Sequence, residues 1–416
     1  MNVWLVCQYY APERGAAQTR MSNLAKLWTA LKASVTVITA IPHTPHGEVM
    51  AEYKNKPGFF KETLDGVPVW RHGVPHKKTT NHGYRLWGQL SFALGLLRHL
   101  VGVKTPPQVV IASTPPMFMA LSAWLMAKRY NAKFVMDVRA LWPSVLVQIG
   151  LLDHQSWQFR LFRKMEYFLY QKAHAIVANS RGIAQHLVDS GIDPKKVFVL
   201  PDGVTDDCFN IRHDASRQAK ALGLRNQLQI NPLTKVVLYD GPHSMAQALG
   251  QVIDAARYLM PRADILFLLI GDGDDKERLQ KIARGMPNVQ FISGQSDEAR
   301  RLYYVLADVA ISCHKDVPGI HTHIPPRLLE LLAAGLPVLA PLAGEGAEIV
   351  RRGACGVVVP PEDPDKLARG VVYMLENSEK VATMAANGPK HISQHYRHTV
   401  VGRQYLALLQ KVIGGQ

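Results

Sequence analysis

The sequence lacks any uninterrupted apolar run of the roughly 18 residues that a membrane-spanning helix requires. The apolar stretch at the N-terminus, before QYYAPE, is also too short for the hydrophobic region of a signal peptide. We therefore expect no transmembrane segment and a cytoplasmic location.

Cysteine is equally scarce, with four residues in a chain of 416 and no pair in a CxxC spacing. Their wide separation excludes a disulfide framework and the common zinc motifs, and it fits a reduced compartment. The sequence therefore predicts no metal site and no bound cofactor. The four are Cys7, Cys208, Cys313 and Cys355.

Acidic residues are few relative to basic ones. Lysine and arginine number 48 and aspartate and glutamate 33, which gives a formal net charge of +15. Such an excess favours phosphate-bearing partners, namely nucleic acid, anionic lipid or a nucleotide. A nucleic-acid partner is the least favoured of these, because no recognition motif accompanies the charge.

The shortage of acid is most pronounced between residues 71 and 104, where neither Asp nor Glu occurs. This segment contains Lys77, Lys78, Arg85 and Trp87, followed by the apolar stretch LSFALGLLRHL. A helix with basic flanks, an aromatic anchor and an apolar face can lie at an anionic membrane surface. The alternative is a core helix beside a solvated basic loop.

What the chain has in abundance is a regular alternation of short β-branched runs with longer helical patterns. The runs include NVWLVCQ, SVTVITA, QVVIAS, AKFVMDV, HAIVANS and KVFVLP, and a second series contains KVVLYDG, ILFLLIGDG, VQFISG, VAISCH, PVLAP and GVVVP. This order predicts an α/β protein with two doubly wound, Rossmann-like domains that face each other across a cleft. We expect domains at 1–204 and 205–395, and a C-terminal helix at 396–416 that docks back on the body.

Three glycine-containing loops follow predicted strands and precede predicted helices, where backbone N–H groups can bind an anion. YAPERGAAQTR contains Gly15, YDGPHSMAQAL contains Gly241 and His243, and GDGDDKERL contains Gly271 and Gly273. The last loop lacks the third glycine of a dinucleotide-binding fingerprint, so that class of site is disfavoured. A simple turn is the alternative for each loop.

Charged and aromatic residues mark two further strand ends and one predicted helix. DVRALWPSV places Arg139 and Trp142 after a strand, which favours a site over a core, and LAGEGAEIV places Gly344 at another strand end, with Glu345 beside it. In IPPRLLELLAAGLPV, Glu330 lies three residues after Arg327 on an otherwise apolar helix. The pair is either a solvated helical ion pair or part of a binding site.

The succession of YYAPERG, RALWP, VANSRGIAQHLVDSG, LLIGDGDDKERL, IPPRLLELLAAGLPVLAP and GEGAEIV resembles the retaining glycosyltransferases of family 4. The resemblance is to the bacterial branch that builds O-antigen, capsule and exopolysaccharide, and it spans nearly the whole chain. It implies the GT-B fold, with the nucleotide sugar bound mainly by the second domain and the acceptor by the first.

By this resemblance, Glu330 accepts hydrogen bonds from the donor ribose, and Arg327 stands near the phosphates. Gly15, Gly344 and Glu345 border the sugar and its phosphates, and Arg139 and Trp142 line the acceptor side. The sequence departs from the family pattern at Thr322, where relatives often have glutamate, and in GPHSMAQAL, which lacks a usual basic pair.

The resemblance implies transfer from a nucleoside diphosphate sugar, UDP-linked, to a lipid-linked acceptor at the inner membrane face. It also implies that the departing phosphate takes the acceptor proton, so that no dedicated base or metal is required. Two alternatives remain: a nucleotide-sugar epimerase of related fold, which acts on the donor alone, and a catalytically silent protein that binds nucleotide sugars.

Overall fold

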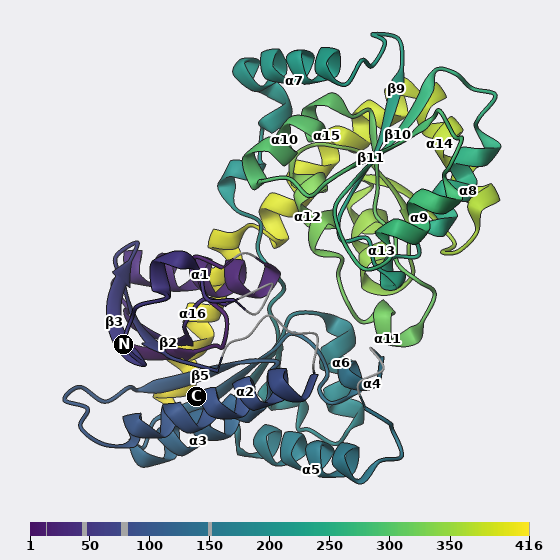
Figure 1. Cartoon of the computed structure of the whole chain (residues 1–416). Helices are drawn as coiled ribbons and strands as arrows, with labels where there is room; N and C mark the ends of the chain where they lie inside the picture. Colours follow the sequence, from purple (N-terminus) through teal and green to yellow (C-terminus); the bar gives the residue numbers. More distant parts are fainter. Residues whose placement is uncertain (14, 44–47, 76–81, 149–151, 416) are drawn as a thin grey trace. The chain divides into compact units, whose positions relative to one another are not determined.

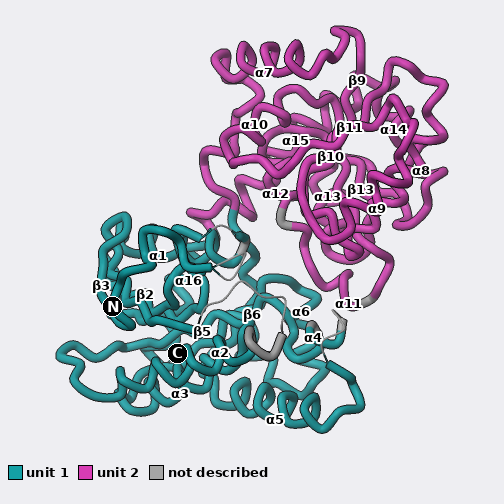
Figure 2. The backbone as a smooth tube through the Cα atoms, in the orientation of Figure 1, with its two compact units in different colours: residues 1–203, 401–416 teal, residues 204–400 magenta. Residues whose placement is uncertain are grey.

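The structure is a computed structural model that describes residues 1–13, 15–43, 48–75, 82–148 and 152–415. The chain forms two compact units, each with its own sheet and core (Figure 2). Unit 1 comprises residues 1–203 and 401–416, and unit 2 comprises residues 204–400.

Unit 1 is built on a sheet whose described strands run in the order β3-β4-β2-β1-β5-β6-β7-β8. Neighbouring strands are parallel, except that β3 is antiparallel to β4. All of the parallel strands except β4 coincide with the β-branched runs of the first series, and β4 was not predicted. The strands are β1 (Asn2–Val6), β2 (Ser34–Ala40), β3 (Phe59–Leu64), β4 (Val67–His72), β5 (Val109–Thr114), β6 (Lys133–Val138), β7 (Ala175–Ala178) and β8 (Val197–Val199).

Helices cover both faces of this sheet, as expected for strands that are apolar on both sides. One face carries α2, α3, α5 and α6, and the other carries α1 and α16 (Figure 1). The helices are α1 (Ala16–Ala30), α2 (His82–Leu96), α3 (Phe118–Arg129), α4 (Ser144–Gln148), α5 (Trp157–Lys172), α6 (Arg181–Asp189) and α16 (His398–Gly414).

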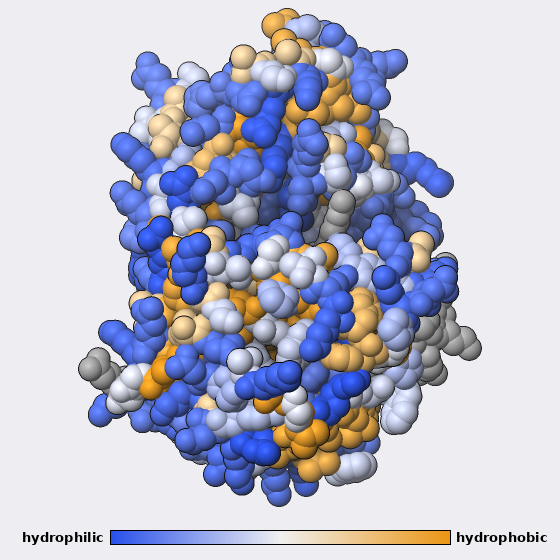
Figure 3. Space-filling view, turned by 90° about the vertical axis from the view of Figure 1, so that its left-hand side faces the viewer, coloured by the Kyte–Doolittle hydropathy of each residue, from blue (hydrophilic) through white to orange (hydrophobic). Residues whose placement is uncertain are grey.

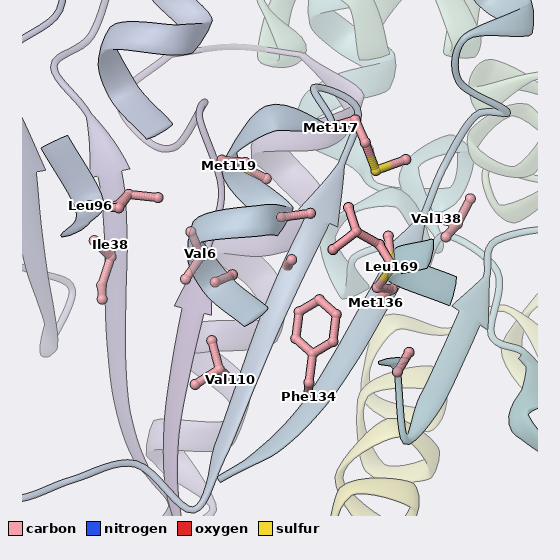
Figure 4. Packing of buried hydrophobic residues seen from close by; sticks show 14 of the residues in the cluster. Val6, Ile38, Leu96, Val110, Met117, Met119, Phe134, Met136, Val138 and Leu169 are labelled. Atoms are coloured by element: carbon pink, nitrogen blue, oxygen red, sulfur yellow. The ribbon is translucent and has the colours of Figure 1, made fainter. Parts of the chain in front are cut away.

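The core beneath α2, α3 and α5 is made by alternate residues of the central strands. Figure 4 shows these side chains meeting residues of the three helices on one face of the sheet. Each labelled side chain is buried, so this face of the sheet is sealed from water. The labelled residues are Val6, Ile38, Leu96, Val110, Met117, Met119, Phe134, Met136, Val138 and Leu169.

Unit 2 contains a fully parallel sheet whose described strands run in the order β11-β10-β9-β12-β13-β14. From β9 the chain moves outward to β11 and then returns to place β12 on the other side of β9. This is the doubly wound arrangement predicted from the second series. The strands are β9 (Lys235–Asp240), β10 (Ile265–Ile270), β11 (Val289–Ile292), β12 (Val309–Ile311), β13 (Val338–Pro341) and β14 (Gly356–Val359).

The helices of unit 2 also lie on both faces of the sheet. Residues from α7, α10, α12, α13 and α15 pack on one face, and residues from α8, α9 and α14 pack on the other. The helices are α7 (Ala215–Gln227), α8 (Gly250–Tyr258), α9 (Lys276–Ile282), α10 (Asp297–Leu306), α11 (Pro318–His321), α12 (Pro326–Ala333), α13 (Gly344–Gly353), α14 (Pro364–Glu376) and α15 (Ser378–His395).

The two segments that connect the units pair with each other inside unit 2. The backbone N–H of Val204 donates to the carbonyl of Tyr396 at 2.7 Å, and that of His398 donates to the carbonyl of Val204 at 2.8 Å. Because of this pairing, residues 396–400 stay with unit 2, whereas the sequence placed them with the C-terminal helix. Helix α16 then packs on unit 1, where the Trp28 indole donates to the carbonyl of Gly402 at 2.9 Å.

Among the described helices, none combines the length and apolar character needed to cross a bilayer. On the face drawn in Figure 3, hydrophobic residues gather in patches among hydrophilic ones. Several large apolar side chains are accordingly exposed, and those on α2 and α5 are described with the site below.

Candidate functional site

The order of the strands in unit 2 indicates where a ligand binds. In open α/β sheets, ligands lie beyond the carboxyl ends of the strands at the point where the winding reverses. In unit 2 that point lies between β9 and its neighbour β12. Side chains at the end of β9, and on the helices that flank β12, are therefore the first candidates.

Glu330 lies on α12, which follows β12, and both of its carboxylate oxygens are paired. Arg327, one turn earlier, donates through Nη1 to Oε1 at 2.7 Å, and Arg300 on α10 donates through Nη2 to Oε2 at 2.8 Å. The Glu330 side chain is 22% exposed and that of Arg327 is 34% exposed. The carboxylate is thus fixed in orientation and still open to solvent.

Arg300 extends this network to the end of β9. Its Nε lies 3.1 Å from Oδ2 of Asp240, the last residue of β9, and 3.1 Å from the Tyr304 hydroxyl, which donates to the same carboxylate. Its Nη1 donates to Asp297 at 2.9 Å. Asp240 and Arg300 are both almost fully buried, so the network links the switch point to α10 and α12.

Burial governs the protonation of this network. It raises the pKa of Asp240, while Arg300 and then Arg327 act in the opposite direction. Burial by itself would lower the pKa of Arg300, but Tyr304, Glu330 and Asp240 together raise it above its ordinary value. Arg300 is therefore charged at every accessible pH, and the fixed charges at the end of β9 are held in place.

Asp240, Arg300 and Tyr304 were not singled out from the sequence. Asp240 carried one signal, since it is the polar residue that ends an apolar strand just before a glycine. Arg300 carried none of that kind, because DEARRLYYVL reads as an ordinary amphipathic helix with an i, i+3 ion pair.

Two of the predicted glycine loops pack directly on each other in unit 2. A Cβ placed on Gly271 would lie 1.8 Å from the carbonyl oxygen of Gly241, and one on Gly273 would lie 2.2 Å from that of His243. Gly271 also has a φ of +146°, which other residues rarely adopt. The glycines are thus required by the close approach of the β9 and β10 loops, which is sufficient reason for their presence without a ligand.

His243 is fully buried between these loops. Burial, and then Lys276, lowers the pKa of its imidazole to about 4. Within the described chain, neither ring nitrogen has a hydrogen-bond partner. The anion-binding role expected of this loop stays a prediction, and a contact through the His243 ring would require the loop to rearrange, because the buried ring presents no surface to a ligand.

Gly344 begins α13 directly after β13. Its φ is +69°, and an added Cβ would lie 2.2 Å from the carbonyl oxygen of His321 on α11. A side chain is therefore excluded at this position, where α13 begins, and the N–H groups of a first helical turn suit an anion. Glu345 lies in this turn. At the position that departs from the family pattern, the Thr322 hydroxyl donates to the carbonyl of Gly319 at 2.8 Å.

The predicted residues of unit 1 lie at the carboxyl ends of its own strands. Gly15 is exposed at the start of α1, and Arg14 lies outside the described residues. Arg20 on α1, which the sequence places near this loop, is buried and donates to Asp137 at 3.0 Å and to the Leu200 carbonyl at 2.9 Å. It ties the ends of β6 and β8 together beneath this loop.

Arg139 and Trp142 follow β6, as predicted. Arg139 donates through Nε to the Ser113 hydroxyl at 3.1 Å and through Nη2 to the carbonyl of Pro115 at 2.9 Å. The expectation that Trp142 lines an acceptor surface is corrected. Its ring is only 2% exposed and packs 4.6 Å, between ring centroids, from Phe162 on α5, so it belongs to the core.

The predicted membrane segment is described in part. Lys77 and Lys78 lie outside the described residues, and Arg85 lies on α2, where only its backbone is described. Trp87 is 53% exposed on α2, and Leu94 on the same helix is 60% exposed. Helix α3 packs between α2 and α5, so the three form one layer (Figure 1).

Helix α5 contributes a second exposed apolar stripe to this layer. Its exposed apolar side chains recur at helical spacing, and exposed basic residues lie beside them. Its one acidic residue, Glu166, is buried, and burial raises the pKa of that carboxyl to about 7. The exposed face is therefore apolar and basic; its residues are Trp157, Arg160, Leu161, Lys164 and Phe168.

Comparison with known protein families gives two matches that together cover most of the chain. Residues 15–203 match the family described as "Glycosyl transferase 4-like domain", and residues 223–391 match "Glycosyl transferases group 1". The two matches correspond closely to unit 1 and unit 2.

A curated relative is described as "Putative colanic acid biosynthesis glycosyl transferase WcaI" from Escherichia coli. It is 26% identical over 334 residues, which cover 78% of this chain and 79% of the relative. Two solved structures share the fold over nearly the whole length of both chains. HepE from Anabaena, in complex with UDP-glucose, has a TM-score of 0.71 at 18% identity and covers 98% of this chain and 99% of its own.

The second structure is WaaG, described as a glycosyltransferase involved in lipopolysaccharide biosynthesis. It has a TM-score of 0.66 at 16% identity, with 100% of each chain covered. At these identities the structural likeness concerns the arrangement of two doubly wound domains, and the chemistry has to be argued from the residues of this chain.

Proposed function

Because this chain belongs to the glycosyltransferases of family 4 and has the GT-B fold, we propose that it transfers a sugar from UDP to a lipid-linked glycan. A role in cell-surface glycan synthesis is supported by the likeness to the colanic acid relative and to WaaG. Unit 2 binds the donor, unit 1 binds the acceptor, and the sugar keeps its anomeric configuration.

The observation that carries the donor proposal is the position of Glu330. Its carboxylate lies on the helix after β12, beside the switch point, and is held by Arg300 and Arg327 with part of its surface open. A ribose offers two adjacent hydroxyl donors, and a carboxylate of fixed orientation offers two acceptor oxygens with lone pairs to spare. Charge-assisted hydrogen bonds of this kind are about twice as strong as neutral ones.

The diphosphate has two candidate partners in unit 2. Arg327 is one-third exposed one turn before Glu330, and the first turn of α13 presents N–H groups beside Gly344. Uracil as the base is supported by the likeness to HepE, which is described in complex with UDP and with UDP-glucose. Glu345, Gly241, Gly271 and Gly273 are proposed to border the same donor.

The chemistry asked of these groups is electrostatic. The bond from the sugar C1 to the β-phosphate oxygen breaks, the acceptor oxygen bonds to C1 on the same face, and the acceptor proton passes to the departing phosphate. Negative charge on that phosphate grows in the transition state, where Arg327 and fixed backbone dipoles stabilise it more than in the ground state. The general base of the reaction is then the leaving group itself.

A lipid-linked acceptor requires access to a membrane, and unit 1 has a surface suited to one. Helix α2 presents Trp87 and Leu94 to solvent, and helix α5 presents Trp157 and Phe168. Basic residues lie among these side chains, on a chain that carries a net charge of +15. We propose that this layer lies against the inner face of the cell membrane and that Arg139 lies on the acceptor side of unit 1.

The experiment that tests the donor proposal is calorimetry with UDP. We expect Glu330→Gln to weaken UDP binding by about tenfold or more, because hydrogen bonds to a charged group contribute about 1.5–3 kcal/mol. Glu348→Gln is the matched control: Glu348 is also a helical glutamate paired with an arginine, at 2.8 Å, but it lies on the exposed side of α13. Parent-like UDP affinity in Glu330→Gln would remove the ribose assignment.

A further inference from the structure

The two arginines that hold Glu330 differ in how firmly each is itself held. Arg300 is 6% exposed and uses all three guanidinium nitrogens, on Glu330, Asp297 and the Asp240–Tyr304 pair. These partners belong to β9, α10 and α12, so the guanidinium cannot turn without breaking contacts to three elements. A planar guanidinium whose three nitrogens are all hydrogen-bonded is held in one orientation.

Arg327 is held far more loosely. Its side chain is 34% exposed, its Nη1 pairs with Glu330 at 2.7 Å, and its Nε is 3.8 Å from Asp240, beyond hydrogen-bond distance. An ion pair this exposed contributes little, at most about 1 kcal/mol. A nearby diphosphate, which carries more charge than one carboxylate, would compete well for it.

The charges of the network favour a fixed Arg300 and an Arg327 that can change its partner. Asp240, Asp297 and Glu330 carry three negative charges, and Arg300 and Arg327 carry two positive ones, which leaves a net charge of 2 − 3 = −1. If Arg300 were neutral, the net charge would be −2, and Arg327 would be the single cation paired with Glu330. Glu330 would then retain Arg327, which would be less available to a phosphate.

We propose that Arg300 is a positioning residue for donor binding. It keeps the Glu330 carboxylate oriented through Oε2 while Arg327 leaves Oε1 for the diphosphate and a ribose hydroxyl takes its place. Arg300 itself touches no part of the donor. This inference rests on the proposed function, since it assumes that Glu330 receives the ribose.

The test is a double-mutant cycle on UDP affinity with Arg300→Gln, Glu330→Gln and the double variant. Arg300→Gln should weaken UDP binding by about tenfold in the parent background and by less than twofold in the Glu330→Gln background, because Arg300 acts only through Glu330. A residue that merely stabilised the fold would cost the same in both backgrounds.

Arg301→Gln is the matched control. Arg301 is the next residue of α10, is 13% exposed and pairs with Asp207 at 2.5 Å. We expect its UDP affinity to stay within twofold of the parent. If Arg300→Gln fails to fold, the same cycle is run with Arg300→Lys, which keeps the charge but loses the fork and should show a smaller loss with the same coupling.

The outcomes of the cycle distinguish the role of Arg300 from the donor assignment. Equal losses in the two backgrounds, or no loss in either, would overturn the role of Arg300 while leaving the donor site intact. Unchanged affinity in Glu330→Gln alone would instead refute the ribose assignment, whatever Arg300 does. Absence of UDP binding by the parent protein would count against the proposed donor and would likewise overturn the inference that depends on it.

Discussion

At the scale of single residues, the charges of unit 2 are arranged around one carboxylate. Removing either arginine partner of a partly buried carboxylate costs more than the pair itself contributes, because the remaining charge is left without compensation. Glu330 has two such partners, one rigid and one exposed. This combination gives a fixed acceptor group that can still exchange one partner for a ligand.

A second pair of titratable residues, in unit 1, gives a prediction about pH. His72, which ends β4, and His99, in the short helix Leu97–Leu100, are buried with their Nε2 atoms 2.8 Å apart. Burial, followed by the neighbouring His99 and Arg98, lowers the pKa of His72 to about 3. Burial, followed by Arg98 and Lys61, lowers the pKa of His99 to about 4.

The unfolded chain takes up protons on both imidazoles as the pH falls through about 6.5, whereas the folded chain takes them up only near pH 4 on His99 and near pH 3 on His72. The stability that the pair contributes is therefore complete above about pH 6.5 and is lost on acidification. Between pH 7 and pH 5 we expect each imidazole to cost about 2 kcal/mol of the free energy of unfolding, about 4 kcal/mol for the pair, measured by urea denaturation.

The variant His99→Phe should make this pH dependence shallower, because it removes one of the two imidazoles that take up protons. The phenyl ring keeps the aromatic contact with Trp70, whose ring centroid is 4.9 Å from that of His99. Exposed His213, changed in the same way, serves as the control and should leave the slope as in the parent. A slope that is the same in His99→Phe and the parent would contradict the assignment to this pair.

The sequence could predict side chains whose neighbours are close along the chain. Arg327 and Glu330 lie three apart on one helix, and they form the expected pair. Arg300 lies thirty residues before Glu330, and its role depends on how α10 packs beside α12, which no local pattern encodes. Trp142 was misassigned for a similar reason, because its partner Phe162 lies on α5, a different element further along the chain.

At the scale of elements, most of the parallel strands were predictable because each is a short apolar run, and the central ones are buried on both faces. Helices α12 and α16 also lie within a few residues of their expected positions. The antiparallel hairpin of β3 and β4 was missed. Its sequence, FFKETLDGVPVWRH, alternates apolar and polar residues around Asp65-Gly66, but a proline within the second strand weakens the signal.

The layer of α2, α3 and α5 gives a prediction about membranes. Anionic vesicles should bind the protein, and changing Arg160 and Lys164 on α5 to Glu should reduce binding by tenfold or more. Each basic residue near anionic headgroups adds about 1 kcal/mol, and reversal of its charge removes that and adds repulsion. Flotation of vesicles with and without phosphatidylserine measures the effect.

A matched control reverses two basic residues on α14 of unit 2, Lys366 and Arg369, which are 58% and 79% exposed. Their variant should float with the parent. Equal flotation of the α5 variant and the parent would remove α5 from the membrane surface, and binding that does not depend on anionic lipid would argue against the electrostatic part of the proposal.

At the scale of the whole molecule, the chain consists of two doubly wound units joined by two connecting segments. The sequence predicted this arrangement because the alternation of strands and helices begins again after a polar stretch near residue 205. It could not show that residues 396–400 remain with unit 2, since that depends on backbone hydrogen bonds between Val204 and a segment almost two hundred residues away.

The central claim is that unit 2 binds the ribose of a nucleotide through hydrogen bonds to Glu330. The most direct measurement is a crystal structure of the protein with UDP bound. The account predicts both ribose hydroxyls within hydrogen-bond distance of the Glu330 carboxylate, about 2.5–3.0 Å, with Arg300 still on Oε2 and Arg327 turned toward the diphosphate. A bound nucleotide whose ribose lies away from a Glu330 that is still paired with both arginines would contradict it.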